Sequence, residues 1–161
     1  MTRTAELLIM GAIIGVIGLI SGYAVLSARS HTRDVTRLAN VREIQMSVDM
    51  YFQNHSAYPS AEVPIALGQA LTSCLSQEGF SGPCSVSGPT PYLSLVTVPP
   101  AAGLKEKVSC NDVNDVYCYS GSEDAFRIEF ELESGNALLG VAKGVNCLSE
   151  NGFSAGACSA I

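Results

Sequence analysis

Residues 6–26 read ELLIMGAIIGVIGLISGYAVL, and this stretch decides the architecture of the chain. After Glu6 it runs from Leu7 to Leu26 without a charged residue. At about 1.5 Å per residue, a helix of this length spans roughly 30 Å, the thickness of the hydrocarbon core of a bilayer. Signal-peptide cores are shorter than this run. The stretch therefore predicts a transmembrane helix rather than a cleaved signal or a buried helix of a soluble domain.

Four glycines in this run fall on one helix face, because Gly11, Gly15, Gly18 and Gly22 step by four, three and four. Each glycine inside a helix costs about 1 kcal/mol relative to alanine. Such a face is typical of membrane helices that pack closely against other helices. Glu6 stands at the edge of the run, where it is either an ordinary interfacial residue or a charge that awaits a partner such as a free amine.

The helical pattern continues beyond the apolar run. Apolar residues recur every three or four positions and predict one buried face: Val35, Leu38, Val41, Ile44, Val48, Tyr51 and Phe52. Pro59 predicts the end of the helix near Asn54. We therefore expect a helix over residues 1–54, apolar over 7–26 and amphipathic over 27–54, followed by an extracytoplasmic head over 55–161.

Charge is divided unevenly along the chain, whose net charge is −6. Residues 1–42 carry five arginines against two acids, a net charge of +3, so residues 43–161 carry −9. An acidic head is a poor surface for nucleic acid, because phosphate contacts need clustered lysine and arginine. No phosphate loop or catalytic set stands out, so we expect neither a nucleic-acid site, nor a cofactor, nor enzymatic activity.

The six cysteines all lie in the head: Cys74, Cys84, Cys110, Cys118, Cys147 and Cys158. They form no CxxC pair, and both histidines lie far from them in the sequence, which favours disulfides over a zinc site. Fifteen pairings are possible for six cysteines. We hypothesise that neighbours pair, as 74–84, 110–118 and 147–158, which would close three short loops worth about 2–3 kcal/mol each.

The C-terminal part of the head reads as β-structure. The segments 116–120 and 125–133 are rich in β-formers, and apolar and polar residues alternate from Phe126 to Glu133, which predicts a half-buried strand. A turn at residues 134–136 predicts a hairpin to a strand at 137–142. Residues 60–91 predict a loop with one short helix at 65–75. The fold class is therefore α+β, with a long helix packed on a small antiparallel sheet.

A polar loop inside the 110–118 segment has two interpretations. Its oxygen-bearing side chains are Asn111, Asp112, Asn114 and Asp115. Calcium prefers such ligands. The same residues also favour turns, because their side chains bond to nearby backbone groups. The sequence favours the turn and keeps calcium as an open hypothesis.

Several of these features together resemble type IV pilins and the related pseudopilins. Glu6-Leu7-Leu8-Ile9 precedes Ala12-Ile13-Ile14-Gly15 at the family spacing, and the amphipathic half-helix leads to Tyr58-Pro59. The resemblance covers residues 6–60 well and the rest loosely. It implies cleavage of a leader by a prepilin peptidase, methylation of the new N-terminal amine, here expected at Met1, and pairing of Glu6 with the amine of a neighbour.

The resemblance also implies a pilin head whose last disulfide loop forms a variable edge. The expected role is that of a structural subunit of a type IV pilus, in which the helices of identical subunits polymerise with the help of an assembly machinery after waiting in the cytoplasmic membrane. Such a surface filament would serve adhesion, twitching motility or DNA uptake. A pseudopilin of a secretion or DNA-uptake machine is the first alternative. A single-pass membrane receptor with a binding head is an alternative of another class.

Overall fold

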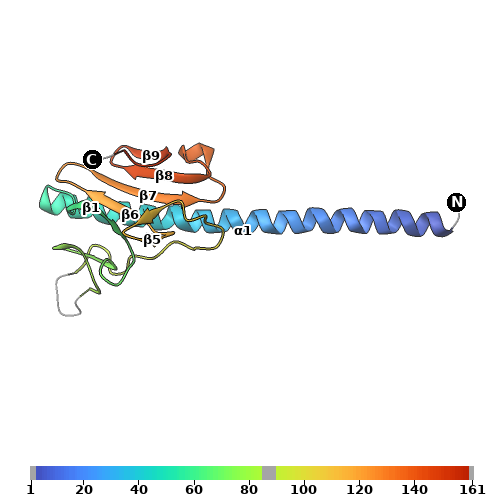
Figure 1. The fold of residues 1–161 in the computed structure, drawn as a ribbon, viewed down its shortest axis with the longest axis horizontal. Coiled ribbons are helices and arrows are strands. Elements are labelled where there is room, and N and C mark those ends of the chain that lie inside the picture. The colour runs from blue at the N-terminus through green and yellow to red at the C-terminus, as the bar shows by residue number, and fades with distance from the viewer. Residues whose placement is uncertain (1–2, 85–89, 160–161) are drawn as a thin grey trace.

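The computed structural model describes residues 3–84 and 90–159. Its dominant element is α1, a continuous helix from Arg3 to His55 (Figure 1). At about 1.5 Å per residue it is close to 80 Å long. The head covers only its C-terminal part, and the N-terminal part extends away from the head (Figure 1). The predicted long helix and its end before Pro59 are confirmed.

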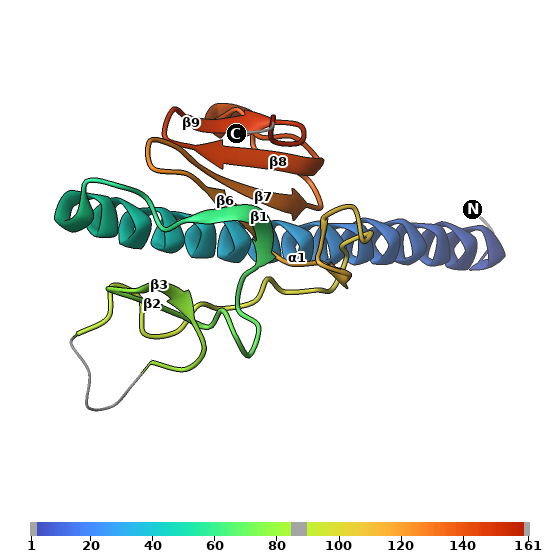
Figure 2. The same ribbon diagram turned by 60° about the vertical axis from the view of Figure 1, so that its left-hand side comes forward.

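The head is built on one antiparallel sheet of five strands in the order β1-β6-β7-β8-β9. One face of this sheet packs on α1, while two small two-stranded sheets, β2-β3 and β4-β5, complete the head (Figure 2). The chain therefore has the α+β fold that the sequence predicts. The strands are β1 (Ala61–Ala66), β2 (Cys74–Ser76), β3 (Gly79–Ser81), β4 (Ser109–Cys110), β5 (Val113–Asn114), β6 (Cys118–Gly121), β7 (Phe126–Leu132), β8 (Gly144–Ser149) and β9 (Gly152–Ala155).

The core lies between the C-terminal half of α1 and the inner face of the sheet. Side chains at most 9% exposed come from α1 and β7: Leu38, Val41, Ile44, Val48, Phe126, Ile128, Phe130 and Leu132. Full burial of a large apolar side chain contributes about 1.5–3 kcal/mol. The alternation predicted in β7 is confirmed, because its four apolar residues all point into this core.

The predicted apolar face of α1 is wrong at its first residue. Val35 is 65% exposed, whereas its neighbours Asp34 and Arg37 are buried. Both charged residues continue the buried face, since Asp34 lies seven residues before Val41 and Arg37 lies seven before Ile44. The head therefore meets this turn of the helix through an ionic contact instead of an apolar one.

The short helix predicted at 65–75 is wrong. Ile65 and Ala66 belong to β1, where they pair with Tyr119 and Cys118 of β6. Gly68 then turns the chain with a φ of 76°, a conformation that an α-helix cannot accommodate. The residues after the turn form non-helical contacts, such as the hydrogen bond from the N–H of Gly68 to the carbonyl oxygen of Thr72, and β2 begins at Cys74.

The strand predicted at 137–142 is also wrong. Ala137–Leu139 form a 3₁₀ helix, η1, because the side chain of Asn136 accepts a hydrogen bond from the backbone N–H of Leu138. Gly140 ends η1 in the left-handed region. The strand that pairs with β7 starts later, at Gly144 opposite Leu132.

Candidate functional site

The first candidate site is the part of α1 that no head residue covers. Every large apolar side chain from Leu7 to Leu26 is at least 50% exposed. By length and composition, α1 is the one helix in residues 3–84 and 90–159 that could cross a membrane. Water solvates such a surface poorly, because each Å² of apolar area removed from water contributes about 25 cal/mol. A membrane or other helices are the environments that suit it.

The glycine face of α1 is open over its whole length. At Gly11, Gly15, Gly18 and Gly22, an added Cβ would meet no atom within 4 Å among the described residues. These glycines therefore serve no contact within the subunit, although each lowers the helical propensity of α1. Close approach by a partner helix would account for the face.

Two residues of the predicted assembly site are outside what the structure describes. Met1, the expected modified N-terminus, precedes the described residues. Glu6 lies within α1, but its side chain is outside the described part of the chain. The pairing of Glu6 with a neighbouring amine therefore stays a prediction.

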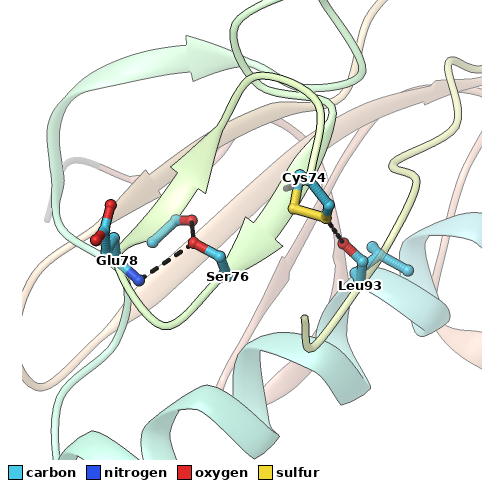
Figure 3. The surroundings of a disulfide bond; sticks show 6 residues. Cys74, Ser76, Glu78 and Leu93 are labelled. Carbon is cyan, nitrogen blue, oxygen red and sulfur yellow. Dashed lines mark hydrogen bonds between the residues drawn. A yellow bond between two sulfur atoms is a disulfide. The ribbon is translucent and has the colours of Figure 1, made fainter. Parts of the chain in front are cut away.

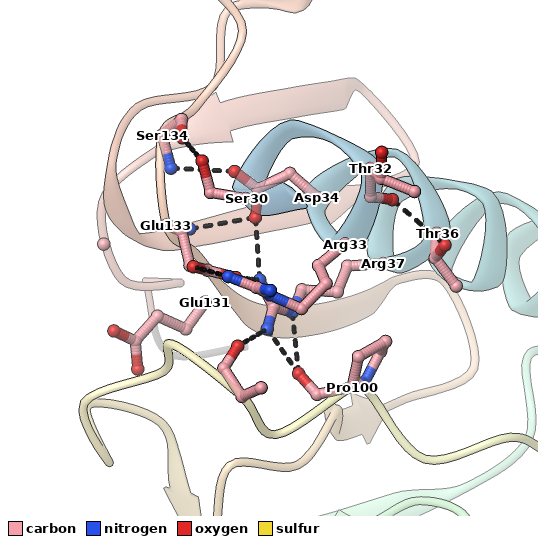
Figure 4. Close-up of polar contacts among 12 residues, drawn as sticks. Ser30, Thr32, Arg33, Asp34, Thr36, Arg37, Pro100, Glu131, Glu133 and Ser134 are labelled. Carbon is pink, nitrogen blue, oxygen red and sulfur yellow. Dashed lines mark hydrogen bonds and ion pairs between the residues drawn. The ribbon is translucent and has the colours of Figure 1, made fainter. Parts of the chain in front are cut away.

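The second candidate site is an ionic cluster where α1 leaves the head (Figure 4). Arg37, fully buried, donates from Nη1 to Asp34 Oδ1 and to Glu133 Oε1, each at 2.8 Å. Arg33 donates from Nε and Nη2 to the two oxygens of Glu133, at 2.7 and 2.6 Å. This bidentate geometry gives the strongest form of the ion pair. The hydrogen bond from Arg33 is the main cause that lowers the pKa of Glu133, and contact with Arg37 adds to it.

Backbone groups complete the cluster, so that each of its buried charged side chains has several partners. Asp34 accepts hydrogen bonds from the backbone N–H groups of Glu133 and Ser134, at 2.9 and 2.7 Å. Arg37 also donates to the carbonyl oxygens of Pro100 and Ala102 (Figure 4). The cluster therefore joins α1, the end of β7 and the loop after residue 99. It fixes the angle between helix and head.

Glu131 acts as a second buried anchor beside this cluster. Its side chain is on the outer face of the sheet but is only 5% exposed. Its carboxylate accepts hydrogen bonds from the backbone N–H groups of Lys105 and Lys107, the shortest at 3.0 Å. The loop of residues 100–107 is thus fastened to β7 by backbone donors, which leaves the two lysine side chains exposed.

The hypothesised neighbour pairing of the cysteines is confirmed. Disulfides join 74 to 84, 110 to 118 and 147 to 158, and no free cysteine is present in the described residues. The first closes the loop around β2 and β3, where the sulfur of Cys84 lies 3.6 Å from the carbonyl oxygen of Leu93 (Figure 3). Such bridges form and persist in oxidising compartments.

The predicted calcium loop forms a tight turn at Asn111 and Asp112 between β4 and β5, and the chain bends again at Asp115, after β5. Asn111, Asp112 and Asp115 all have a positive φ, between 50° and 63°. Asp115 accepts a hydrogen bond from the backbone N–H of Glu106, and the amide of Asn111 donates to the carbonyl oxygen of Pro64. Across the described ranges, no group of three or more histidine, cysteine, aspartate or glutamate side chains could hold a metal ion. These contacts favour the turn interpretation, and calcium binding stays the alternative hypothesis.

Comparisons with known protein families, curated proteins and solved structures find no match for this chain.

Sequence reasoning missed the ionic cluster. Asp34 and Arg37 lie at positions of the buried helical face, and a charged pair on such a face is a signal of a buried ion pair. Their partner Glu133 closes an alternating strand and looks like one more polar residue of its outer face. Only the tertiary structure brings them together.

Proposed function

We propose that this chain is the structural subunit of a type IV pilus-like filament. Residues 7–26 hold the newly made subunit in the cytoplasmic membrane, with the head on the extracytoplasmic side. The same residues then leave the membrane and pack against those of identical subunits in the filament core. The observation that carries the proposal is an apolar helical segment, exposed along its whole length, whose glycines have no role within the subunit.

A plain membrane anchor would explain only part of this observation. Twenty apolar residues of any kind anchor a head, and leucine would stabilise the helix better than glycine. Small residues on one face let two helix backbones approach closely, which is how membrane helices associate where the hydrophobic effect provides no driving force between them. The glycine face therefore supports a function in which helices pack on one another.

The three disulfides and the rigid joint between helix and head fit a filament subunit. In a filament every head must stand at the same angle to its helix, and the ionic cluster of Arg33, Asp34, Arg37 and Glu133 holds this angle at the point of exit. A filament outside the cell also requires heads that resist unfolding without chaperones, which short disulfide loops provide.

The test is whether cells that express this chain carry fibres made of it. Surface fibres are sheared off, imaged by electron microscopy and identified by mass spectrometry. Long fibres of this chain support a pilus subunit, and short fibres confined to the periplasm support a pseudopilin. A monomer that never polymerises supports a receptor and rejects the proposal.

A matched pair of variants tests the helix face itself. Gly15→Leu closes the glycine face, and Ile14→Leu changes the neighbouring face without closing it. Both should insert into the membrane, because leucine favours insertion. Only Gly15→Leu should lower the yield of sheared fibres, and equal yields would reject packing through this face.

A further inference from the structure

The head carries its positive charge at one end. All three lysines of the chain, Lys105, Lys107 and Lys143, line a single hollow beside Ser30 and Ser134, where α1 leaves the head. We call these lysines the stem-end patch. In the part of the chain that the structure describes, no lysine forms an ion pair, since the three ion pairs there all use Arg33 or Arg37.

The lysine side chains are free to meet another surface. All three lysines are exposed, and only their backbone, through Lys105 and Lys107, is used to hold Glu131. Four acids lie near them. Glu131 and Glu133 line the same hollow, where Glu131 is buried against backbone N–H groups and Glu133 is paired with Arg33 and Arg37. Glu106 is exposed, and Asp115 is half-buried with one oxygen bonded to the N–H of Glu106. Arg29 adds an exposed positive charge on the adjacent turn of α1. The stem end of the head therefore keeps a net positive charge.

The opposite end of the head is acidic. Glu123 and Asp124 are exposed in the turn between β6 and β7, and the carbonyl oxygen of Glu123 accepts a hydrogen bond from the N–H of Tyr58, just beyond the end of α1. Glu150 is exposed in the turn between β8 and β9, at the same end of the sheet, because Ser149 pairs with Arg127 at the start of β7. We call Glu123, Asp124 and Glu150 the far-end patch.

Other charged residues near the far-end patch leave this end of the head acidic. Glu62 is exposed beside Ala61, which pairs with Gly121 at the acidic end. Arg127 is the cation nearest this end, but it is half-buried and one of its nitrogen atoms is fully enclosed. The far-end patch therefore keeps a net negative charge.

The two patches cannot neutralise each other within one subunit. The helix between Arg37, near the stem-end patch, and His55, near the far-end patch, spans about 27 Å at 1.5 Å per residue. Charges in water at physiological salt are screened over about 8 Å. Each patch is therefore an independent surface that attracts a partner of the opposite charge.

We propose that the stem-end patch of one head docks on the far-end patch of the next copy of this chain, an inference that rests on the proposed filament. Copies that enter the membrane in one orientation point the same way, so that the base of one head faces the tip of another. A contact between two different surfaces of identical copies is heterologous, and it produces an open helical polymer when the rotation between copies does not close a ring. Opposite charges at the two ends of the head suit this contact and repel a head-to-head or base-to-base one.

Anionic lipid headgroups are the other chemistry that could meet the stem-end patch, since Ser30 lies only four residues beyond Leu26. A lipid surface would explain the lysines alone and would leave the far-end patch without a role. A second copy accounts for both patches with a single contact.

The experiment uses charge reversal in the full-length chain. The stem-end variant carries Lys105→Glu, Lys107→Glu and Lys143→Glu, and the far-end variant carries Glu123→Lys, Asp124→Lys and Glu150→Lys. The combined variant carries all six changes. A Lys→Arg version of the stem-end patch keeps its charge and serves as the matched control. Sheared fibres are measured by immunoblot, after equal amounts of folded subunit have been verified in the membrane by intact disulfides.

Each reversal alone should lower the fibre yield roughly tenfold, since several exposed pairs of a few-fold each are turned into repulsions. The combined variant should recover most of the yield, and the Lys→Arg control should match the wild type. Normal yield of the stem-end variant would overturn the inference. Loss without recovery in the combined variant would overturn it too and would assign the lysines to lipid. Wild-type fibres in these experiments keep the proposed function standing, whereas their absence would reject both.

Discussion

Arg37 on α1 and Glu133 after β7 are 96 residues apart in the sequence, yet their side chains form a buried ion pair with 2.8 Å between Nη1 and Oε1. Arg37 has no exposed surface, and the hydrogen bonds of its side chain reach either Asp34 or the head. A guanidinium in this position is satisfied only while helix and head keep one relative orientation. The ion pair therefore fixes the orientation of the head on α1.

Removal of Arg37 should be among the most destabilising single changes in the head. Arg37→Ala leaves Asp34 and part of Glu133 as buried charges without a full partner, and loss of one member of a buried pair costs about 3–5 kcal/mol. Arg29→Ala removes an exposed arginine of the same helix and should change the free energy of unfolding by less than about 0.5 kcal/mol. Urea unfolding in detergent, followed by near-ultraviolet circular dichroism, measures both. Equal changes in the free energy of unfolding for the two variants would contradict the structural role of Arg37 between α1 and the head.

Acid pH should weaken the same ionic contact between α1 and the head. The hydrogen bond from Arg33, with help from Arg37, holds the pKa of Glu133 below its ordinary value. A carboxyl with a lowered pKa in the folded state contributes stability that is complete above its unfolded pKa, about 4.3, and that is lost as the pH falls through the folded value. Glu133→Gln should therefore lower the melting temperature at pH 7 and flatten its decline at acid pH.

Melting temperatures between about pH 3 and pH 7 measure the effect of Glu133→Gln. Glu123→Gln removes an exposed carboxyl at the far end of the head and controls for the loss of one negative charge. A decline in the Glu133→Gln variant as steep as in the wild type would show that another carboxyl causes the acid sensitivity.

A buried amide holds the turn before β8. Asn146 is fully buried, accepts from the N–H of Ala142 and donates to the carbonyl oxygens of Ala142 and Gly144, at 2.7–2.8 Å. Asn146→Ala leaves these backbone groups unpaired and should lower the free energy of unfolding by about 1–3 kcal/mol. Asn151→Ala, at an exposed amide, should have almost no effect in the same urea titration. A neutral Asn146→Ala would mean that water replaces the amide.

The loop of Asn111, Asp112, Asn114 and Asp115 should not respond to calcium. The side chains of Asn111, Asn114 and Asp115 are hydrogen-bonded to Pro64 and Glu106, and the positive φ values in the loop belong to turns. Thermal midpoints in calcium and in chelator should therefore be equal. A midpoint that rises with calcium concentration would overturn the turn interpretation and establish a metal site.

The helix and β7 could be predicted from the sequence because burial of one face sets the spacing of their apolar residues. These residues recur every three or four positions in the helix and at every second position in the strand. The predictions are wrong where a local hydrogen bond, or a partner distant in the sequence, outweighs the spacing of apolar residues. Asn136 caps η1 where a strand is predicted, and Ile65 pairs with Tyr119 of β6 where a helix is predicted. Only the helical residues of the ionic cluster could be predicted. Asp34 and Arg37 lie on the buried face, but no local pattern indicates that Glu133 contacts them.

Glu6→Ala tests the remaining part of the proposed assembly site. A carboxylate near the end of a membrane helix costs less than the 2.5–3.5 kcal/mol or so that it costs at the centre, so its removal should not impair insertion. In a filament core without water, a carboxylate paired with the amine of a neighbour is strongly favoured over an unpaired amine. Glu6→Ala should therefore keep the subunit in the membrane, as measured by alkaline extraction, and sharply reduce sheared fibres.

Glu6→Gln keeps the shape of the side chain and should reduce fibres equally, whereas Arg3→Ala should assemble normally. Normal fibre numbers in both Glu6 variants would reject the pairing and leave the glycine face as the sole determinant of helix packing.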